Sequence, residues 1–150
     1  MSNVTNYLSP EEINAYQSRI DNADAGYNRS LAKLGSRRQE ATSDFNTSRG
    51  RLNTQWDNYQ RSLGGQFAKR NIFRSGLMGR ALDEYASNRQ NSVSDLERSY
   101  DRQVGGFNET QKDMDMILGM NRIQVDKDRT ARQQTLEAQR VLANDLTRYQ

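Results

Sequence analysis

The feature that most constrains this chain is a narrow apolar stripe, spaced every three or four residues along nearly its whole length. That spacing is typical of one face of an α-helix and differs from the alternation of a β-strand. Many members are also eleven residues apart, and an 11-residue repeat of about 3.67 residues per turn predicts a straight or slightly right-handed supercoil. The longest ladders of this spacing are Ala23, Leu34, Phe45, Trp56 and Phe67, and Tyr85, Leu96, Phe107 and Leu118.

The start of the first helix is marked by Ser9-Pro10-Glu11-Glu12, a capping box with proline at the first helical position. No later proline interrupts the pattern, because Pro10 is the only one in the chain. Few apolar residues occur in 119–135, which favours a break or a frayed stretch there. The expected parts are an N-terminal arm 1–9, a first helical arm 10–70, a basic glycine-containing turn 71–77 and a second helical arm 78–150.

The segment between the arms, residues 69–80, reads KRNIFRSGLMGR. Glycine adopts backbone conformations that other residues avoid, so Gly76 or Gly79 suits the left-handed residue of a cap. Ser75 suits the N-cap of the second arm. We therefore expect the chain to fold back here, stripe against stripe, in preference to forming one continuous or kinked helix.

Composition indicates that such a hairpin needs partners. Hydrophobic residues make up 33% of the 150 residues, a low share for a globular domain. A helical arm with a narrow apolar stripe is not stable alone in water. The expected fold class is therefore all-α: a long antiparallel hairpin of two coiled-coil-like arms that assembles into an oligomeric bundle or ring. The residues expected to pack in this assembly are Leu34, Phe45, Trp56, Phe67, Leu96, Phe107 and Leu118.

The residues present argue against catalysis. The chain has no Cys and no His, which removes thiol chemistry, the commonest metal ligand and the commonest general base. The close carboxylates Asp113 and Asp115, and likewise Asp126 and Asp128, are two residues apart and do not face each other on a helix, so they read as solvated surface. No apolar run approaches membrane-spanning length. We expect no enzyme, no catalytic or metal site, no cofactor, no small-molecule substrate and no membrane span.

Two glycine pairs, Gly64-Gly65 and Gly105-Gly106, interrupt the arms. Each glycine inside a helix costs up to about 1 kcal/mol relative to alanine. Three explanations stay open: weak points tolerated within a packed helix, close approach of a neighbouring helix, and a hinge.

The basic turn is the candidate docking element. Its expected members are Arg70, Phe73, Arg74, Gly76 and Arg80. A solvated loop or a contact with another protein is favoured over a phosphate contact, because the net charge of +3 is a weak electrostatic footprint for nucleic acid.

Residues 67–82, FAKRNIFRSGLMGRAL, resemble a segment of small structural proteins of tailed-bacteriophage virions. In those proteins a basic stretch of the pattern A-R-R-G-[IL]-x-x-S-G leads through a short turn into a second long helix. Ser75 and Gly76 match that pattern, whereas Asn71 stands where a glycine is usual. The resemblance implies a non-enzymatic helical component of the neck, tail, portal-associated core or capsid interior, which bridges or plugs symmetric rings.

The same resemblance implies a place and partners. The protein would be part of the virion, assembled in the host cytoplasm, and would contact copies of itself and portal, adaptor or tail proteins, with DNA contact secondary. Two alternatives remain. One is a nucleic-acid-binding or packaging accessory, which rests on the sequence pI of about 9.3 and the many arginines. The other is a polar helical chain ordered only by a protein partner.

Overall fold

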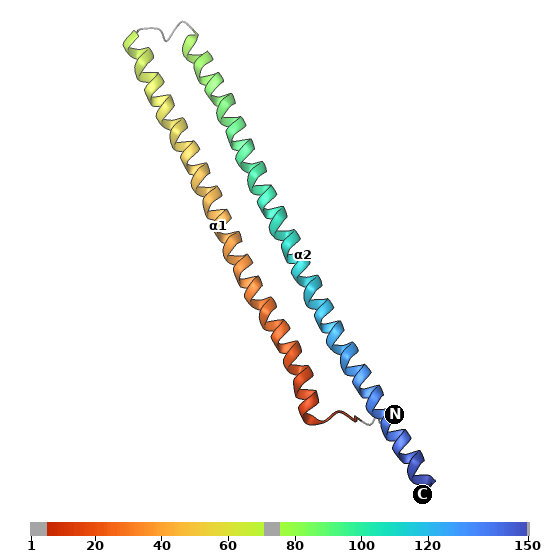
Figure 1. Ribbon diagram of the computed structural model, residues 1–150. Helices are drawn as coiled ribbons and strands as arrows, with labels where there is room; N and C mark the ends of the chain where they lie inside the picture. The colour runs from red at the N-terminus through yellow and green to blue at the C-terminus, as the bar shows by residue number, and fades with distance from the viewer. Residues whose placement is uncertain (1–5, 71–75, 150) are drawn as a thin grey trace, which may run out of the picture. The chain divides into compact units, whose positions relative to one another are not determined.

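The computed structural model describes residues 6–70 and 76–149, in which two long helices pack against each other as a hairpin (Figure 1). Helix α1 spans Pro10–Arg70 and helix α2 spans Leu77–Arg148. No strand occurs in these two stretches. The expected all-α hairpin is confirmed, and the expected oligomer stays a prediction.

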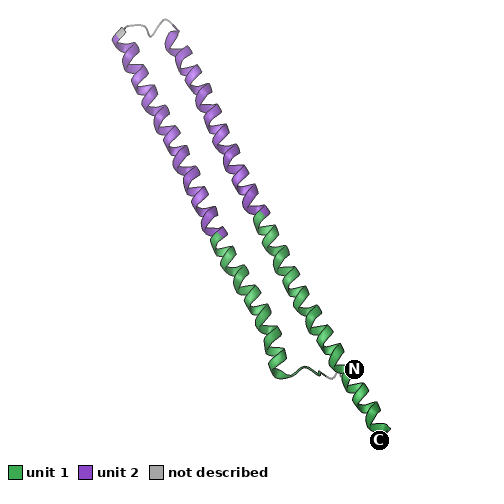
Figure 2. Ribbon diagram, in the orientation of Figure 1, with its two compact units in different colours: residues 1–33, 110–150 green, residues 34–109 purple. Residues whose placement is uncertain are grey.

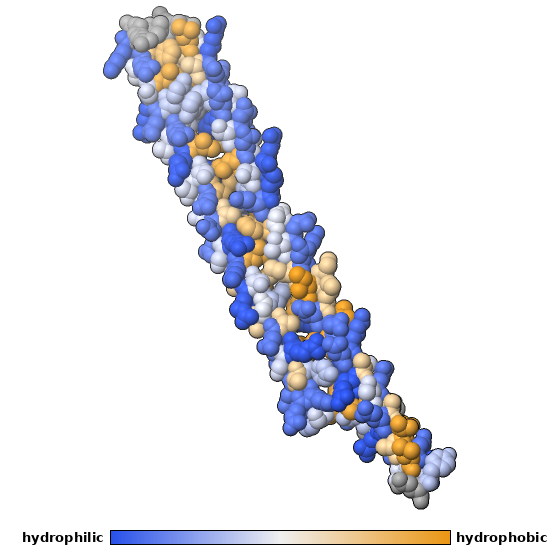
Figure 3. All heavy atoms as spheres, viewed as in Figure 1, coloured by the Kyte–Doolittle hydropathy of each residue, from blue (hydrophilic) through white to orange (hydrophobic). Residues whose placement is uncertain are grey.

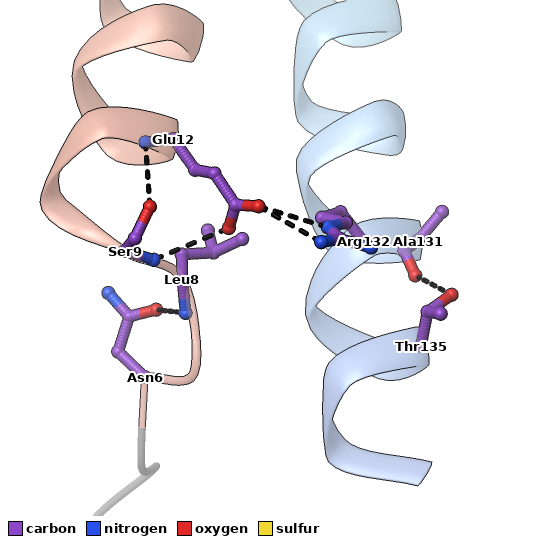
Figure 4. A network of polar contacts seen from close by, with 7 residues as sticks. All are labelled: Asn6, Leu8, Ser9, Glu12, Ala131, Arg132 and Thr135. Atoms are coloured by element: carbon purple, nitrogen blue, oxygen red, sulfur yellow. Dashed lines mark hydrogen bonds and ion pairs between the residues drawn. The ribbon is translucent and has the colours of Figure 1, made fainter. Parts of the chain in front are cut away.

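Helix α1 begins at the predicted capping box, which Figure 4 shows from close by. The Glu12 amide donates a hydrogen bond to Ser9 Oγ at 3.1 Å, and the Ser9 amide donates to Glu12 Oε2 at 3.3 Å. The amide of Ile13 donates to the Ser9 carbonyl at 3.0 Å, the first backbone bond of the helix. These bonds satisfy amides at the helix start that have no partner within the helix.

Helix α2 begins after Gly76, whose φ of +72° lies in the left-handed region. The Gly76 carbonyl accepts the amide of Arg80 at 3.1 Å, so Gly76 itself occupies the N-cap position. The left-handed assignment is therefore confirmed for Gly76 and wrong for Gly79, which lies inside α2. Ser75, the other N-cap candidate, lies outside the described residues.

Helix α2 runs without interruption through 119–135, so the expected break is wrong. The stretch keeps one well-buried anchor, Val125, which is 4% exposed. It also carries arginine and aspartate side chains that bind α1, including Arg122 to Asp24 at 2.7 Å. Burial of Val125 therefore supports the helix where apolar residues are sparse, and the exposed ion pairs add little free energy to it.

The hairpin divides into two compact units (Figure 2). Unit 1 comprises Met1–Lys33 and Thr110–Gln150, and unit 2 comprises Leu34–Glu109. Each unit contains one part of α1 lying antiparallel to one part of α2.

The cores of both units are thin. In the described residues no side chain is fully buried, and the face shown in Figure 3 is mostly hydrophilic, with hydrophobic residues between. The helices are thus held by half-buried side chains along their line of contact, here called the seam. The best-buried apolar residues are Leu8, Leu34, Ala41, Leu63 and Val125.

The glycine pairs lie inside continuous helix. A methyl group added at Gly64 would meet only Met78 Cε, at 4.0 Å, and one added at Gly65, Gly105 or Gly106 would meet nothing within 4 Å. Close approach of a neighbouring helix in this chain therefore does not explain the pairs. No described helix is long and apolar enough to cross a membrane.

Candidate functional site

The seven predicted stripe residues are all shielded from solvent to some degree. Leu34 is buried, and the other six are half-buried. Six of the seven lie in unit 2, and Leu118 lies in unit 1. Within the single chain these residues serve the seam, and their role in an oligomer stays a prediction.

The seam of unit 2 is built around stacked aromatic rings. Tyr85 of α2 stacks with Tyr59 at a centroid distance of 3.9 Å and with Trp56 at 5.2 Å. Phe45 of α1 stacks with Tyr100 of α2 at 4.6 Å. Such pairs contribute roughly 0.5–1.5 kcal/mol each beyond the area they bury. These rings pack the two helices together and are not available for stacking on a ligand.

Arginines extend the aromatic seam at its edges. The guanidinium of Arg89 lies 5.8 Å from the Trp56 ring and donates a hydrogen bond to Asn53 Oδ1. That of Arg38 lies 5.6 Å from the Phe107 ring and donates to Asn108 Oδ1 at 2.9 Å. An arginine over the face of an aromatic ring adds cation–π attraction.

The seam of unit 1 has ion pairs between α1 and α2 beside its buried apolar residues Leu8 and Val125. Three arginines reach a carboxylate on the facing helix at 2.7–3.1 Å. All six side chains are about a third or more exposed, so each pair contributes little to stability. The pairs are Arg19–Asp128, Asp24–Arg122 and Glu12–Arg132.

Two aspartates that read as solvated surface turn out to bind the facing helix. Asp128 accepts from Arg19 at 2.9 Å, and this hydrogen bond, followed by one from Gln124, lowers the pKa of its carboxyl. Asp115 accepts the hydroxyl hydrogen of Tyr27, which raises the pKa of that tyrosine. Sequence spacing could not show these contacts, because the partners are far apart in the chain.

Glu12 joins the helix cap to the ion pairs (Figure 4). Its Oε2 atom accepts the Ser9 amide, while its Oε1 atom accepts Arg132 Nε and Nη2 at 3.2 and 3.1 Å. Next to it, the Tyr7 amide donates to Gln133 Oε1 at 3.1 Å. One carboxylate therefore fixes both the start of α1 and its position along α2.

The predicted docking turn is only partly described. The side chain of Arg70 and the whole of Phe73 and Arg74 lie outside the described residues. Gly76 and Arg80 are exposed at the start of α2. The docking role of the turn stays a prediction.

No chemical centre emerges from the described residues. They contain no group of three or more His, Cys, Asp or Glu that could hold a metal ion. One hollow of about 760 Å³ is a shallow surface of α1 lined by polar side chains, among them Gln39, Ser43 and Thr47. A groove of about 380 Å³ in unit 1 is more apolar and is lined by Leu8, Ile13, Tyr16 and Ile20, with polar residues around them.

The most unusual surface is a second apolar stripe on α2 in unit 1, which the sequence reasoning missed. Its large members are well exposed: Met116 62%, Met120 61%, Ile123 56% and Leu142 62%. On the face shown in Figure 3, hydrophobic side chains are uncovered near the C-terminal end of α2. We call this surface the outer stripe. Its positions in α2 are Met116, Met120, Ile123, Lys127, Ala131, Gln134, Ala138, Leu142 and Asp145, and Tyr149 follows one residue beyond the end of the helix.

A sequence signal for the outer stripe did exist. Met116 and Met120 each stand two residues from Leu118, which places them about 200° around the helix from the seam at 100° per residue. Ile123 likewise stands two residues from Val125, which is a seam residue. Apolar residues two positions from seam positions indicate a second face, and this face is what remains uncovered when the hairpin closes.

Comparison of the chain with protein-family models, curated proteins and solved structures gave no match.

Proposed function

We propose that this chain is a non-enzymatic structural subunit of a tailed-phage virion, a helical component of the neck, tail or portal-associated core that bridges or plugs symmetric rings. The observation that carries the proposal is the exposed outer stripe of α2. Monomeric soluble proteins rarely expose contiguous apolar patches larger than a few hundred Å², and a larger exposed patch marks an interaction site. A chain whose thin seam leaves a second apolar face open is suited to packing into an assembly.

The phage part of the proposal rests on the resemblance of residues 67–82. The described ends of that segment are compatible with it, since α1 ends at Arg70 and α2 starts at Leu77 after the left-handed Gly76. The partners proposed are copies of the chain and portal, adaptor or tail proteins of the virion.

DNA contact is secondary in this proposal. Three arginines, Arg19, Arg122 and Arg132, bind carboxylates of the facing helix. An arginine paired with a carboxylate contributes less to binding a polyanion, because the pair carries no net charge.

The test is to find the chain in particles. Particles would be purified from cells that carry the genome encoding the chain, and the protein measured by quantitative mass spectrometry. We expect several copies per particle, with the same number in particles emptied of DNA. Detection in the cell lysate and absence from particles would refute the proposal, and loss together with the DNA would favour the packaging accessory.

A matched pair of variants links incorporation to the outer stripe. Met116→Glu combined with Met120→Glu places two charges on it, and should reduce incorporation at least tenfold, because burying an unpaired carboxylate is costly. The control is Asn121→Glu combined with Gln139→Glu, which adds equal charge at exposed polar positions of α2. Both proteins should keep wild-type helicity by circular dichroism. Equal incorporation of the two variants would exclude this end of the stripe as a contact.

A further inference from the structure

The outer stripe has the same period as the seam. Met120, Ala131 and Leu142 are eleven residues apart, and so are Met116, Lys127, Ala138 and Tyr149. A stripe of this period runs nearly straight along a helix. It can therefore lie along a second stripe of the same period over many turns without drifting off it.

Two charged residues lie on this stripe, and they have opposite signs. Lys127 and Asp145 both occupy stripe positions, and both are exposed. If two copies paired in parallel, lysine would meet lysine and aspartate would meet aspartate. If they paired antiparallel, each lysine could meet the other copy's aspartate. Like charges placed opposite each other in an interface are strongly disfavoured, so the charge pattern selects the antiparallel arrangement.

We infer that two copies of the chain pair through the outer stripes of their α2 helices, antiparallel, about a two-fold axis level with Leu136. In this register Lys127 of each copy faces Asp145 of the other, and Ile123 faces Tyr149. Close to the axis, Gln134 faces Ala138. The small side chains at Ala131 and Ala138 allow the two helices to approach closely at the centre, and the larger apolar residues close both ends.

Among the residues that the structure describes, every position of the outer stripe is exposed. The α1 part of unit 1 contacts α2 through seam residues such as Arg122, Val125 and Arg132. The outer stripe lies roughly on the opposite side of α2. Beyond Arg140, which lies 5.9 Å from the Tyr7 ring, the described part of α2 is exposed throughout.

The size of the contact sets the expected affinity. Residues 123–149 form a stretch about 40 Å long, and helices are about 10–12 Å wide, so each copy covers roughly 400–480 Å² in projection and the two copies together about 800–950 Å². Specific interfaces of this size are at the weak end of the range, which indicates a Kd on the order of micromolar. A weak pair suits a subunit held at high local concentration within an assembly.

This inference deepens the proposed function by naming one partner of the outer stripe, and it can fail independently of that function. Met116 and Met120 lie outside the paired stretch, so they remain available to another protein. A chain found in particles but monomeric in solution would overturn the pairing alone. A chain that pairs in solution but is absent from particles would overturn the virion role alone.

The test is light scattering behind a sizing column, from a few micromolar to several hundred micromolar. The wild type should pass from 17.3 kDa towards twice that mass. Lys127→Glu and Asp145→Lys, made singly, should each weaken association about tenfold, because two exposed attractions become repulsions. The double variant Lys127→Glu/Asp145→Lys restores opposite charges and should recover the wild-type Kd.

The control is a double reversal at Asp95 and Arg98, an exposed pair on α2 in unit 2 at 3.8 Å, which should leave the mass unchanged. A wild type that stays monomeric throughout this range would overturn the pairing. A dimer insensitive to both single reversals would place the contact elsewhere. Single reversals that weaken the dimer without recovery in the double variant would exclude the antiparallel register, and a mass above the dimer would exclude the two-fold pair.

Discussion

The two units use the same spacing of contact residues but different chemistry. Unit 2 is held by stacked rings, with Tyr85 between two aromatic residues of α1 and Tyr100 against Phe45. Unit 1 is crossed by three arginine–carboxylate pairs and by the bond from Tyr27 to Asp115. Stacked rings bury apolar area, whereas exposed ion pairs bury little.

The difference indicates that the two units contribute differently to stability and to the pairing of residues. Aromatic stacking is stabilising and insensitive to salt, since it depends on apolar area and ring geometry. Exposed ion pairs contribute little free energy, but mispairing them leaves charges next to wrong neighbours. We therefore expect unit 2 to supply most of the stability, and unit 1 to fix which residue of α1 lies opposite which residue of α2.

The largest effect should come from the centre of the aromatic seam. Tyr85→Ala removes the ring that both Trp56 and Tyr59 contact, and should cost about 2–3 kcal/mol of unfolding free energy. The measurement is urea unfolding followed by circular dichroism. Tyr149→Ala is the control, because the Tyr149 side chain is 92% exposed and lacks such a stack. Equal costs for the two variants would contradict the role given to the rings.

A smaller loss of unfolding free energy is expected when Glu12, which belongs to both the helix cap and an ion pair, is replaced. Glu12→Ala removes the acceptor of both the Ser9 amide and Arg132, and should cost about 1 kcal/mol. Hydrogen exchange should rise at residues 9–14 and near Arg132, and less in unit 2. Glu11→Ala, one residue earlier and exposed, is the control. If exchange near Arg132 did not change, Glu12 would act only as a cap.

Smaller still is the coupling between Asp24 and Arg122. A double-mutant cycle with Asp24→Asn and Arg122→Gln should give a coupling free energy of about 0.5 kcal/mol at low salt. It should fall towards zero at 1 M salt, where the Debye length is about 3 Å. The same cycle at Trp56 and Tyr85, with alanine at each, should not change with salt. A coupling at Asp24 and Arg122 that persists in high salt would show that the two units do not differ as described.

The smallest effect is a pH dependence at Asp128. Its lowered pKa means that the carboxylate is favoured in the folded state, so its contribution is present above the ordinary value of about 4 and is lost as pH falls below it. An NMR titration should place the Asp128 midpoint below that value. Arg19→Gln should move the midpoint upward, because it removes the largest cause of the shift. An unmoved midpoint would rule out Arg19 as that cause.

Local sequence signals predict where the helices begin and how long they are. The capping box at Ser9 and Glu12, the single Pro10 and the flexible Gly76 mark where helices begin, and the regular apolar spacing marks their length. Each of these signals acts within a few residues of itself. For that reason the hairpin and the bounds of its helices could be predicted from the sequence.

The contacts between the helices depend on which residue of α1 lies opposite which residue of α2, and that is not a local property of the sequence. The sequence predicts Asp128 to be solvated surface, whereas in the structure Arg19, far away in the chain, donates a hydrogen bond to it. The continuity of α2 through 119–135 was missed for the same reason, since stabilisation there comes from α1. The outer stripe was missed because the apolar residues of α2 were assigned to one face, although Met116, Met120 and Ile123 stand two positions from seam residues.

The absence of any fully buried side chain among the described residues has a thermal consequence. The heat capacity of unfolding comes mainly from hydrating newly exposed apolar area, and globular proteins average about 12–15 cal/mol/K per residue. A chain with so thin a core exposes little more apolar area when it melts, so its heat capacity increment should lie well below that average. Its stability curve should then be shallow, and it should resist cold better than a globular domain of equal maximum stability.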